Sequence, residues 1–74
     1  MNYFELYEKR KQLKPGSVWT HWRFPDSTVT IISTFNCPGL DGPKIYLEYT
    51  LDDKFCSHYR ELYAVLDKME KIRD

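Results

Sequence analysis

The sequence lacks an apolar run of membrane length, a secretory leader and an excess of charge of either sign. A membrane-spanning helix needs about 20 consecutive apolar residues, and no stretch of the chain approaches that length. Residues 1–5 have neither the basic region nor the apolar region of a signal peptide. The 11 basic and 11 acidic residues give a formal net charge of zero, whereas nucleic-acid-binding domains usually carry a basic excess. We therefore expect a cytoplasmic protein that makes no membrane contact, with nucleic acid as a less favoured partner.

The chain is also poor in residues that bind metals or act as nucleophiles. In the cytosol Cys37 and Cys56 are expected to be reduced thiols and not a disulfide. No paired cysteine knuckle of the zinc-binding kind is present, and no nucleophile elbow, phosphate-binding loop or dinucleotide fingerprint occurs. We expect no metal, no cofactor and no enzymatic activity. The alternative is a thiol-dependent activity, in which a histidine would have to activate one of the cysteines.

Aromatic residues, by contrast, are abundant. The 74 residues include 2 Trp, 6 Tyr and 4 Phe. A chain of this length forms one domain and buries only about 60% of its unfolded surface, so its core is thin. Each aromatic side chain can remove roughly 150–250 Å² from water, and the set exceeds what so thin a core needs. We expect the remainder to line a binding surface or a contact between subunits of a homo-oligomer.

The apolar spacing and the turn formers predict a single α+β domain over residues 1–74. Asn2 and Glu5 have the spacing of a capping box. Helices are predicted over 2–13 and 60–72, and a four-stranded β region over 17–58, with strands at 17–23, 28–35, 44–51 and 54–58. Segment 36–43 contains two prolines and two glycines and is predicted to be a loop of the kind that often touches a ligand or partner. Four antiparallel strands in so short a chain predict a small, strongly curved sheet or open barrel with the helices packed against it.

The beginning of this β region resembles a known family. Its residues are Pro15-Gly16-x-Val18-Trp19-x-His21-Trp22, followed later by Ile45-Tyr46-Leu47-Glu48-Tyr49 and Lys54-Phe55. They are similar to a family of small bacterial and phage proteins of unknown function, which open with Pro-Gly-x-Val-aromatic-x-His-aromatic and fold as an SH3-like β-barrel. The resemblance covers roughly residues 14–66. It departs after Phe55, where the family has aromatic-x-Arg-Pro and only Arg60 corresponds. The resemblance implies an SH3-like barrel of about four strands and no mechanism.

Alternation along the predicted strands places a set of aromatic and polar side chains on the face opposite the expected core. The set comprises Trp19, His21, Arg23, Tyr46, Glu48, Thr50, Cys56 and His58. Rings to stack on and a guanidinium group suit a planar or anionic small molecule. The predicted ligand-binding residues are Trp19, His21, Arg23, Tyr46, Glu48 and His58. In the alternative interpretation a terminal helix covers this face, and Trp19 and Tyr46 belong to the core.

A local basic patch follows the first predicted helix. It consists of Lys9, Arg10, Lys11 and Lys14, close in sequence to the two tryptophans. Basic side chains beside aromatic rings can bind single-stranded nucleic acid. The alternative is a solvated helix end, at which positive charge is favoured by the helix dipole.

These patterns predict a non-enzymatic binding module. By analogy with small phage proteins, it would act as an inhibitor that captures a small anionic or nucleotide ligand or a host protein. One alternative is a homo-oligomeric protein-interaction module without a small-molecule ligand. The other is an accessory protein that binds nucleic acid weakly.

Overall fold

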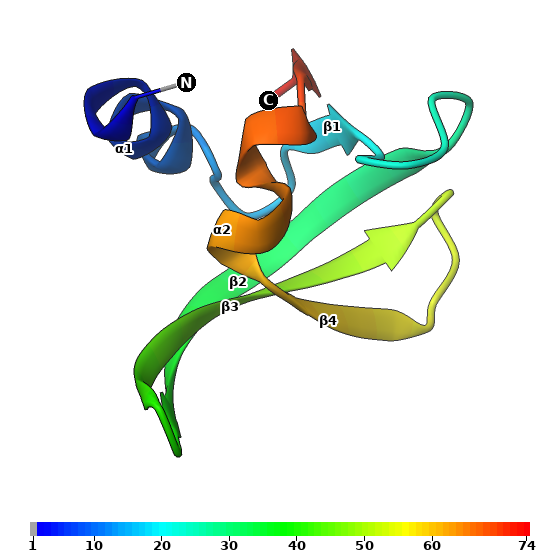
Figure 1. Ribbon diagram of the computed structural model, residues 1–74. Coiled ribbons are helices and arrows are strands. Elements are labelled where there is room, and N and C mark those ends of the chain that lie inside the picture. The colour runs from blue at the N-terminus through cyan, green and yellow to red at the C-terminus, as the bar shows by residue number, and fades with distance from the viewer. Residues whose placement is uncertain (1) are drawn as a thin grey trace.

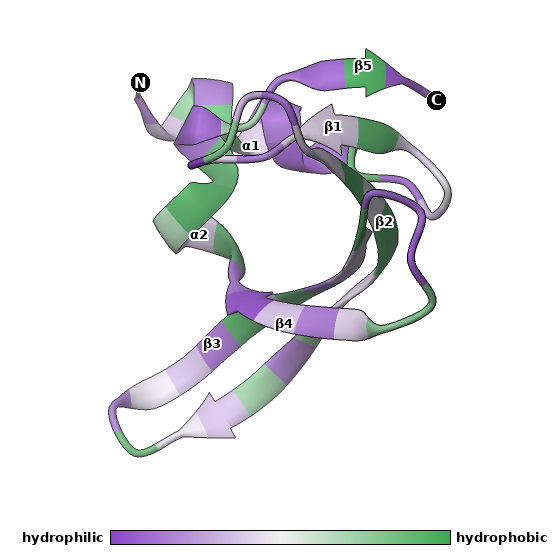
Figure 2. Cartoon of the chain, turned by 90° about the vertical axis from the view of Figure 1, so that its right-hand side faces the viewer, coloured by the Kyte–Doolittle hydropathy of each residue, from purple (hydrophilic) through white to green (hydrophobic). Residues whose placement is uncertain are grey.

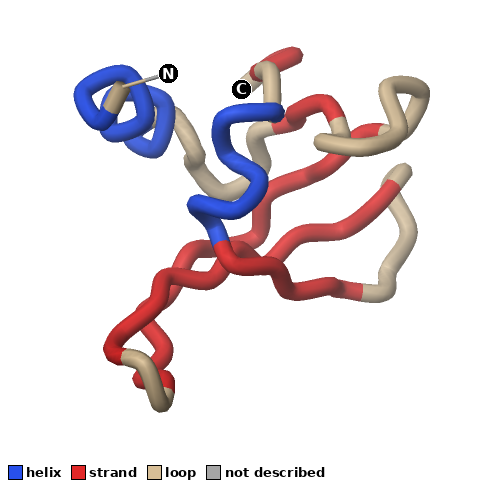
Figure 3. Tube along the Cα trace, viewed as in Figure 1, coloured by secondary structure: helices blue, strands red, loops and turns tan. Residues whose placement is uncertain are grey.

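The computed structural model describes residues 2–74 and contains one five-stranded antiparallel sheet with few short helices (Figures 1 and 3). In chain order the elements are α1 (Tyr3–Lys11), β1 (Val18–Thr20), β2 (Thr28–Gly39), β3 (Gly42–Leu51), β4 (Ser57–Glu61), α2 (Leu62–Val65), the 3-10 helix η1 (Leu66–Lys68) and β5 (Lys71–Arg73). The strands lie side by side in the order β4-β3-β2-β1-β5. Because β4 and β5 form the two edges, the sheet is not closed.

This architecture corrects the predicted fold class. The expected SH3-like barrel of about four strands, with a helix at each end, is wrong, because the described chain forms one open sheet with a fifth strand. That strand comes from the segment 71–73, which pairs with β1 and lies at the end of the helix predicted over 60–72. Pairing gives these residues backbone hydrogen-bond partners that a terminal helical turn would leave to water.

The helix predicted over 60–72 is wrong, because this segment forms α2, η1 and β5. The spacing of three and four predicted an apolar stripe of Tyr59, Leu62, Leu66 and Met69, with Tyr63 and Ile72 beside it. Leu62, Leu66 and Met69 are buried, together with Val65, whereas Tyr59, Tyr63 and Ile72 are exposed. Burial is achieved by the one-turn α2, the tighter η1 and an extended Met69. The periodicity therefore indicated part of the buried set, and it could not tell one continuous helix from two short turns followed by a strand.

The hairpin between the first two predicted strands is confirmed. β1 pairs with β2 in the register Val18↔Thr30, Trp19↔Val29 and Thr20↔Thr28. β1 is shorter than the predicted 17–23, because the chain leaves the sheet at His21 and forms a loop over 21–27. That loop carries both residues that were expected at the end of the strand, His21 and Arg23.

The segment 36–43, predicted to be a loop, is instead the end of a long β-ribbon that projects from the body of the domain (Figure 1). Pro38 pairs with Pro43 and Gly39 with Gly42, so Leu40 and Asp41 alone make the turn. Gly42 has φ of 112°, a conformation that side-chain-bearing residues rarely adopt. Proline is tolerated here because it lies at the end of the ladder.

The first helix forms, with Asn2 as its N-cap. The Asn2 side chain accepts a hydrogen bond from the backbone N of Glu5 at 2.9 Å, which satisfies one of the free donors of the first turn. The helix is shorter than the predicted 2–13 and buries none of its own residues. Leu6 packs partly against the core, and Leu13, just after the helix, is buried. α1 therefore lies beside the domain and is not a layer of it (Figure 1).

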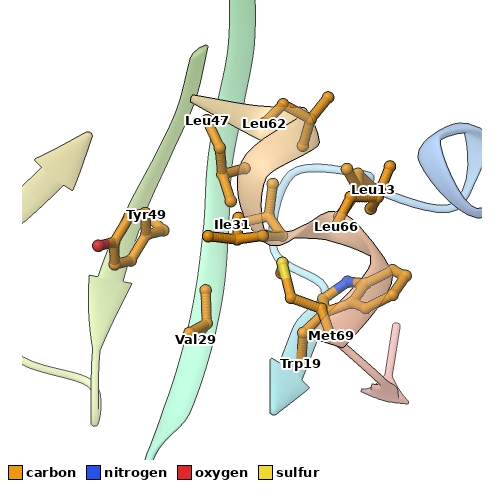
Figure 4. Close-up of a cluster of buried hydrophobic side chains, with 10 residues drawn as sticks. Leu13, Trp19, Val29, Ile31, Leu47, Tyr49, Leu62, Leu66 and Met69 are labelled. Atoms are coloured by element: carbon orange, nitrogen blue, oxygen red, sulfur yellow. The ribbon is translucent and has the colours of Figure 1, made fainter. Parts of the chain in front are cut away.

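The core lies between one side of the sheet and the C-terminal segment (Figure 4). Trp19 is 1% exposed and has Met69 and Leu66 beside it in Figure 4. Its indole Nε1 donates to Ser17 Oγ at 3.0 Å, and Ser17 Oγ donates to the carbonyl of Lys14 at 2.6 Å. The buried N–H thus has a partner, as a buried indole requires. The members of the buried cluster are Leu13, Trp19, Val29, Ile31, Leu47, Tyr49, Leu62, Val65, Leu66 and Met69.

We expect Trp19→Phe to destabilise the fold, because it shrinks the largest fully buried side chain and removes the donor to Ser17. The free energy of unfolding in urea should fall by about 2–4 kcal/mol. Phe55→Ala removes a ring that is 105% exposed and should change that free energy by less than about 0.5 kcal/mol. Equal losses in the two variants would contradict the assignment of Trp19 to the core.

Candidate functional site

The predicted binding face does not assemble as one surface. Trp19 lies in the core, so it cannot serve as an exposed stacking platform. His21 and Arg23 lie in the loop 21–27. Tyr46 and Glu48 lie on one face of the sheet, and His58 lies on the other.

The register between β3 and β4 explains this split. Glu48 pairs with Tyr59, and Tyr49 pairs with His58. Directly opposed residues in an antiparallel pair share a face, so Tyr59 joins Glu48 and His58 joins the buried Tyr49. The strand predicted at 54–58 occupies 57–61. Its register with β3, and not the alternation within the strand, places His58 on the face opposite Tyr46 and Glu48.

At the margin of the core, on the same face of the sheet, lies a group of aromatic and basic side chains that we call the basic aromatic rim. It consists of His21, Trp22, Arg23 and Phe24 from the loop, Tyr49 from β3, and His58 and Arg60 from β4. Trp22 makes an edge contact with Tyr49, with ring centroids 5.1 Å apart. The rings of Tyr49 and His58 stack at 5.6 Å. The loop 21–27 therefore folds back onto the sheet and contributes rings next to those of β3 and β4.

His21 organises this loop through its ring nitrogen. Its Nδ1 accepts hydrogen bonds from the backbone N of Arg23 at 2.9 Å and of Phe24 at 3.1 Å. An imidazole nitrogen that accepts two N–H groups carries no proton. The ring also stacks on Trp22, with centroids 4.1 Å apart. The neutral form of His21 thus fixes both the turn of the loop and the position of the indole.

The charges around His21 favour that neutral form. Burial lowers the pKa of His21 below its ordinary value of 6.5, and the positive charges of Arg60 and Arg23 lower it further, while Asp52 opposes them. Burial also raises the pKa of Tyr49, against which a hydrogen bond and the positive charge of Arg60 act. Arg60 therefore lies close to both rings. Two guanidinium groups and one carboxylate give the rim a positive local balance.

Sequence reasoning identified His21, Arg23 and His58 as binding residues but did not assign the other rim residues to a site. Tyr49 and Trp22 were expected on the core side; Tyr49 is buried there and Trp22 packs against it. Phe24 was expected in a turn and lies in the loop 21–27. Arg60 was noted only as a match to the family. The signal that could have found Arg60 was its spacing of two from His58, which places both on one face of a strand.

The opposite face of the sheet carries a second group that we call the outer patch: Phe35, Tyr46, Glu48 and Tyr59. Phe35 stacks on Tyr46 with ring centroids 6.1 Å apart, and Tyr59 meets Phe35 edge-on at 5.9 Å. The carboxylate of Glu48 accepts from Ser33 Oγ and from Tyr59 OH, each at 3.1 Å. Tyr46 and Glu48, predicted to bind the same ligand as His21, therefore belong to a separate surface.

The predicted basic patch is largely engaged in local contacts. Lys9 Nζ donates to the carbonyl of Asp67 at 3.5 Å, and Arg10 donates to Tyr63 OH at 3.1 Å. Lys11 pairs with Glu8 at 3.3 Å. The contacts of Lys9 and Arg10 attach α1 to the C-terminal helical turns, whereas the Lys11–Glu8 pair lies within α1. A nucleic-acid-binding role for these residues and Lys14 stays a prediction.

The two cysteines lie in different parts of the fold. Cys37 is on β2, with Sγ 3.9 Å from the Pro38 carbonyl, and the exposed Cys56 precedes β4, with Sγ 3.9 Å from the Ser57 carbonyl. Within residues 2–74, no three His, Cys, Asp or Glu side chains are grouped as metal ligands. No helix in the same residues has the length and apolar character needed to cross a membrane.

Comparison of the chain with protein-family models, with curated proteins and with solved structures finds no match in any of the three. The resemblance drawn from Pro15-Gly16 and the residues that follow therefore stays a prediction.

We expect the stability of the domain to fall as the pH falls through about 6.5. His21 has a lower pKa in the folded state than in the unfolded state, so the unfolded chain binds the proton more readily over that interval. The stabilising contribution is thus complete above 6.5 and is lost below it. Urea unfolding between about pH 8 and pH 5 measures this loss.

His21→Asn supplies the control for that measurement. An asparagine side chain can accept the same backbone N–H groups but does not titrate, so its pH profile should be flatter than that of the unmodified chain. His58→Asn, which alters the exposed histidine, should keep the original slope. If His58→Asn flattens the profile and His21→Asn does not, the assigned role of His21 is wrong.

Proposed function

We propose that this domain is a non-enzymatic binding module that captures a small planar anion of the nucleotide class at the basic aromatic rim. The observation that carries the proposal is the placement of Arg23 and Arg60 around the rings of His21, Trp22 and Phe24. The buried Tyr49 supports them from below, because Trp22 rests on it edge-on. Ring faces stack on a planar base, and guanidinium groups bind carboxylate or phosphate oxygens with paired N–H donors. The rim therefore offers both a ring face for the base and guanidinium groups for the anion.

The exposure of the rim supports this role. Arg23, Arg60 and His58 are exposed, and Phe24 is 55% exposed. Trp22 is half-buried, since its edge rests on Tyr49. Half-buried rings are held in position before a ligand arrives, which lowers the entropy lost on binding. The accessible guanidinium groups can then orient on the anion.

The charge of the rim sets the class of ligand. A dianion gains from the two arginines and meets one nearby carboxylate, that of Asp52. Neutral His21 uses Nδ1 within the loop, which leaves its Nε2 to donate a hydrogen bond. Phosphate and ring recognition by these groups needs no general base or nucleophile, and neither cysteine has a histidine as its hydrogen-bond partner.

We expect Arg60→Gln to weaken binding of adenosine 5′-monophosphate or guanosine 5′-monophosphate by about 10- to 100-fold, because a charge-assisted hydrogen bond is lost. Isothermal titration calorimetry on the whole chain measures the affinity. Arg73→Gln is the matched control, since Arg73 is an exposed arginine on β5, and it should change the affinity by less than about twofold. Equal effects of the two changes, or no heat with either nucleotide at millimolar concentration, would refute the proposal.

A self-associating protein-interaction module is a second candidate, favoured by the aromatic residues of α1. Tyr3 is 91% exposed, Phe4 73% and Tyr7 54%, and helical geometry places the three within about one third of the helix circumference. Such a set of exposed rings is typical of a protein contact.

If α1 is that contact, light scattering should give a mass above the 8.9 kDa of one chain. The combined change Tyr3→Ser, Phe4→Ser and Tyr7→Ser should return it to the monomer mass, because it removes most of the exposed apolar surface of the helix. Phe55→Ser, which alters an exposed ring outside α1, should leave the mass unchanged. A monomer mass for the unmodified chain would exclude this candidate.

A further inference from the structure

β4 is an edge strand of the sheet. It pairs with β3 and is the terminal strand in the order β4-β3-β2-β1-β5. Every second residue of an edge strand directs its backbone N–H and C=O away from the sheet. β4 has five residues and is coloured largely as hydrophilic in Figure 2. These free backbone groups are ready to pair with another extended segment.

The outer patch lies directly beside this edge. Tyr59 is on β4 itself and is 55% exposed, and Phe35 is 39% exposed. The Tyr59 hydroxyl reaches across to Glu48 on β3 at 3.1 Å. The ring of Tyr59 therefore extends from the open edge of the sheet to the Glu48 carboxylate. A side chain that stacks on this ring from the open edge can reach Glu48.

Glu48 is a carboxylate that lies opposite Tyr59 and has no cationic partner among the described residues. Its neighbours are the hydroxyls of Ser33 and Tyr59, one on each oxygen. The ion pair that lies nearby joins Lys44 to Glu61 at 3.8 Å and leaves Glu48 unpaired. A carboxylate accepts about four hydrogen bonds, so two of its acceptor positions remain for a donor.

We infer that β4 and the outer patch dock an extended, arginine-containing segment of a partner protein, which adds to the sheet as a sixth strand and places its guanidinium group on Tyr59 and Glu48. The backbone of β4 supplies the strand pairing, Tyr59 the ring face and Glu48 the charge.

The dimensions of a sheet support this placement. Neighbouring strands lie about 4.8 Å apart, and a residue opposite Tyr59 would have its Cβ about 5 Å from that of Tyr59. A long side chain from that position lies along the Tyr59 ring, toward Glu48. Arginine stacks on aromatic faces and pairs with carboxylates through its planar fork of donors, which lysine lacks.

The same observations exclude the opposite chemistry at this surface. The charge among the rings is negative, so phosphates and anionic headgroups are repelled. The docking surface is also separate from the basic aromatic rim, because His58 and Arg60 point to the other face of β4. The inference therefore does not depend on the proposed nucleotide binding.

The probe for this surface is the peptide acetyl-Thr-Val-Arg-Val-Thr-amide, titrated into the isotopically labelled full chain while amide chemical shifts are recorded. We expect the shifts of residues 57–61 to move, and those of 71–73, on the opposite edge, to stay. The same peptide with glutamine in place of arginine should bind at least about 10-fold more weakly, because the charge-assisted contact is lost. A peptide methylated on alternate backbone nitrogens should not bind, since it cannot pair with the edge.

Variants of the chain test whether the charge of Glu48 contributes to peptide binding independently of the stability of the fold. Glu48→Gln removes the charge while its amide can still accept from one of the two hydroxyls, Ser33 or Tyr59, and donate to the other. It should weaken binding of the arginine peptide at least about 10-fold. Glu70→Gln removes an exposed carboxylate outside β4, and it should change the affinity by less than about twofold. Arg73→Gln, on the opposite edge strand β5, should leave peptide binding unchanged.

Four results would overturn the inference. The first is equal affinity for the arginine and glutamine peptides, and the second is shift changes confined to residues 71–73. The third is the absence of binding at millimolar peptide. The fourth is a concentration-dependent shift of residues 57–61 without peptide, together with a doubled mass, because a second copy of the chain would then occupy the edge.

Discussion

The burial of Trp19 between the sheet and the C-terminal segment is the constraint on which the rest of the structure depends. Its indole is covered by side chains that arrive about fifty residues later, among them Met69. Thr20, the next residue, donates its backbone N–H to Glu70 at 2.8 Å and accepts from Glu70 through its hydroxyl at 2.9 Å. The short β1 is thus where the first hairpin is hydrogen-bonded to the C-terminal segment, and the pairing of β5 with β1 continues this contact.

This closure decides which surfaces are available for function. With the core side filled by α2, η1 and Met69, the accessible rings include those of the rim, the outer patch and α1. β4 serves two of these surfaces at once, because alternate residues point to opposite sides of the sheet. His58 and Arg60 reach the rim, and Tyr59 reaches the outer patch. The two proposed binding activities can therefore occur on one strand without sharing a side chain.

The two surfaces differ in charge, although the chain as a whole has none. The rim gathers Arg23 and Arg60 near a single carboxylate, that of Asp52, whereas the outer patch has the unpaired Glu48 among its rings. A net charge of zero thus conceals two local fields of opposite sign. Local fields determine which ligands approach a surface, so composition alone could not indicate the partners of this domain.

Several local features could be predicted because nearby residues encode them. The Asn2 cap, the β1–β2 hairpin and the start of β2 at Thr28 follow from capping and turn chemistry. The predicted strands at 44–51 and 54–58 leave a connection at 52–53, and there the Asp52 side chain accepts from the Thr28 backbone N at 2.9 Å. The start of β4 could not be predicted, because Lys54–His58 alternates as well as 57–61 does. The register between β3 and β4 separated His58 from Tyr46 and Glu48, and the burial of Trp19 and the loop at 21–27 separated the remaining members of the predicted site.

The sequence by itself determined that Leu62, Leu66 and Met69 are buried, that the first two strands form a hairpin, and that aromatic rings would exceed the needs of the core. Only the tertiary structure decided that Lys71–Arg73 is a strand, that Trp19 is core, and that Arg60 approaches His21. Each of these outcomes depends on pairing between residues distant in the chain. Local propensity cannot choose among such pairings, because their free energies come from the partner strand and from the side chains packed across it.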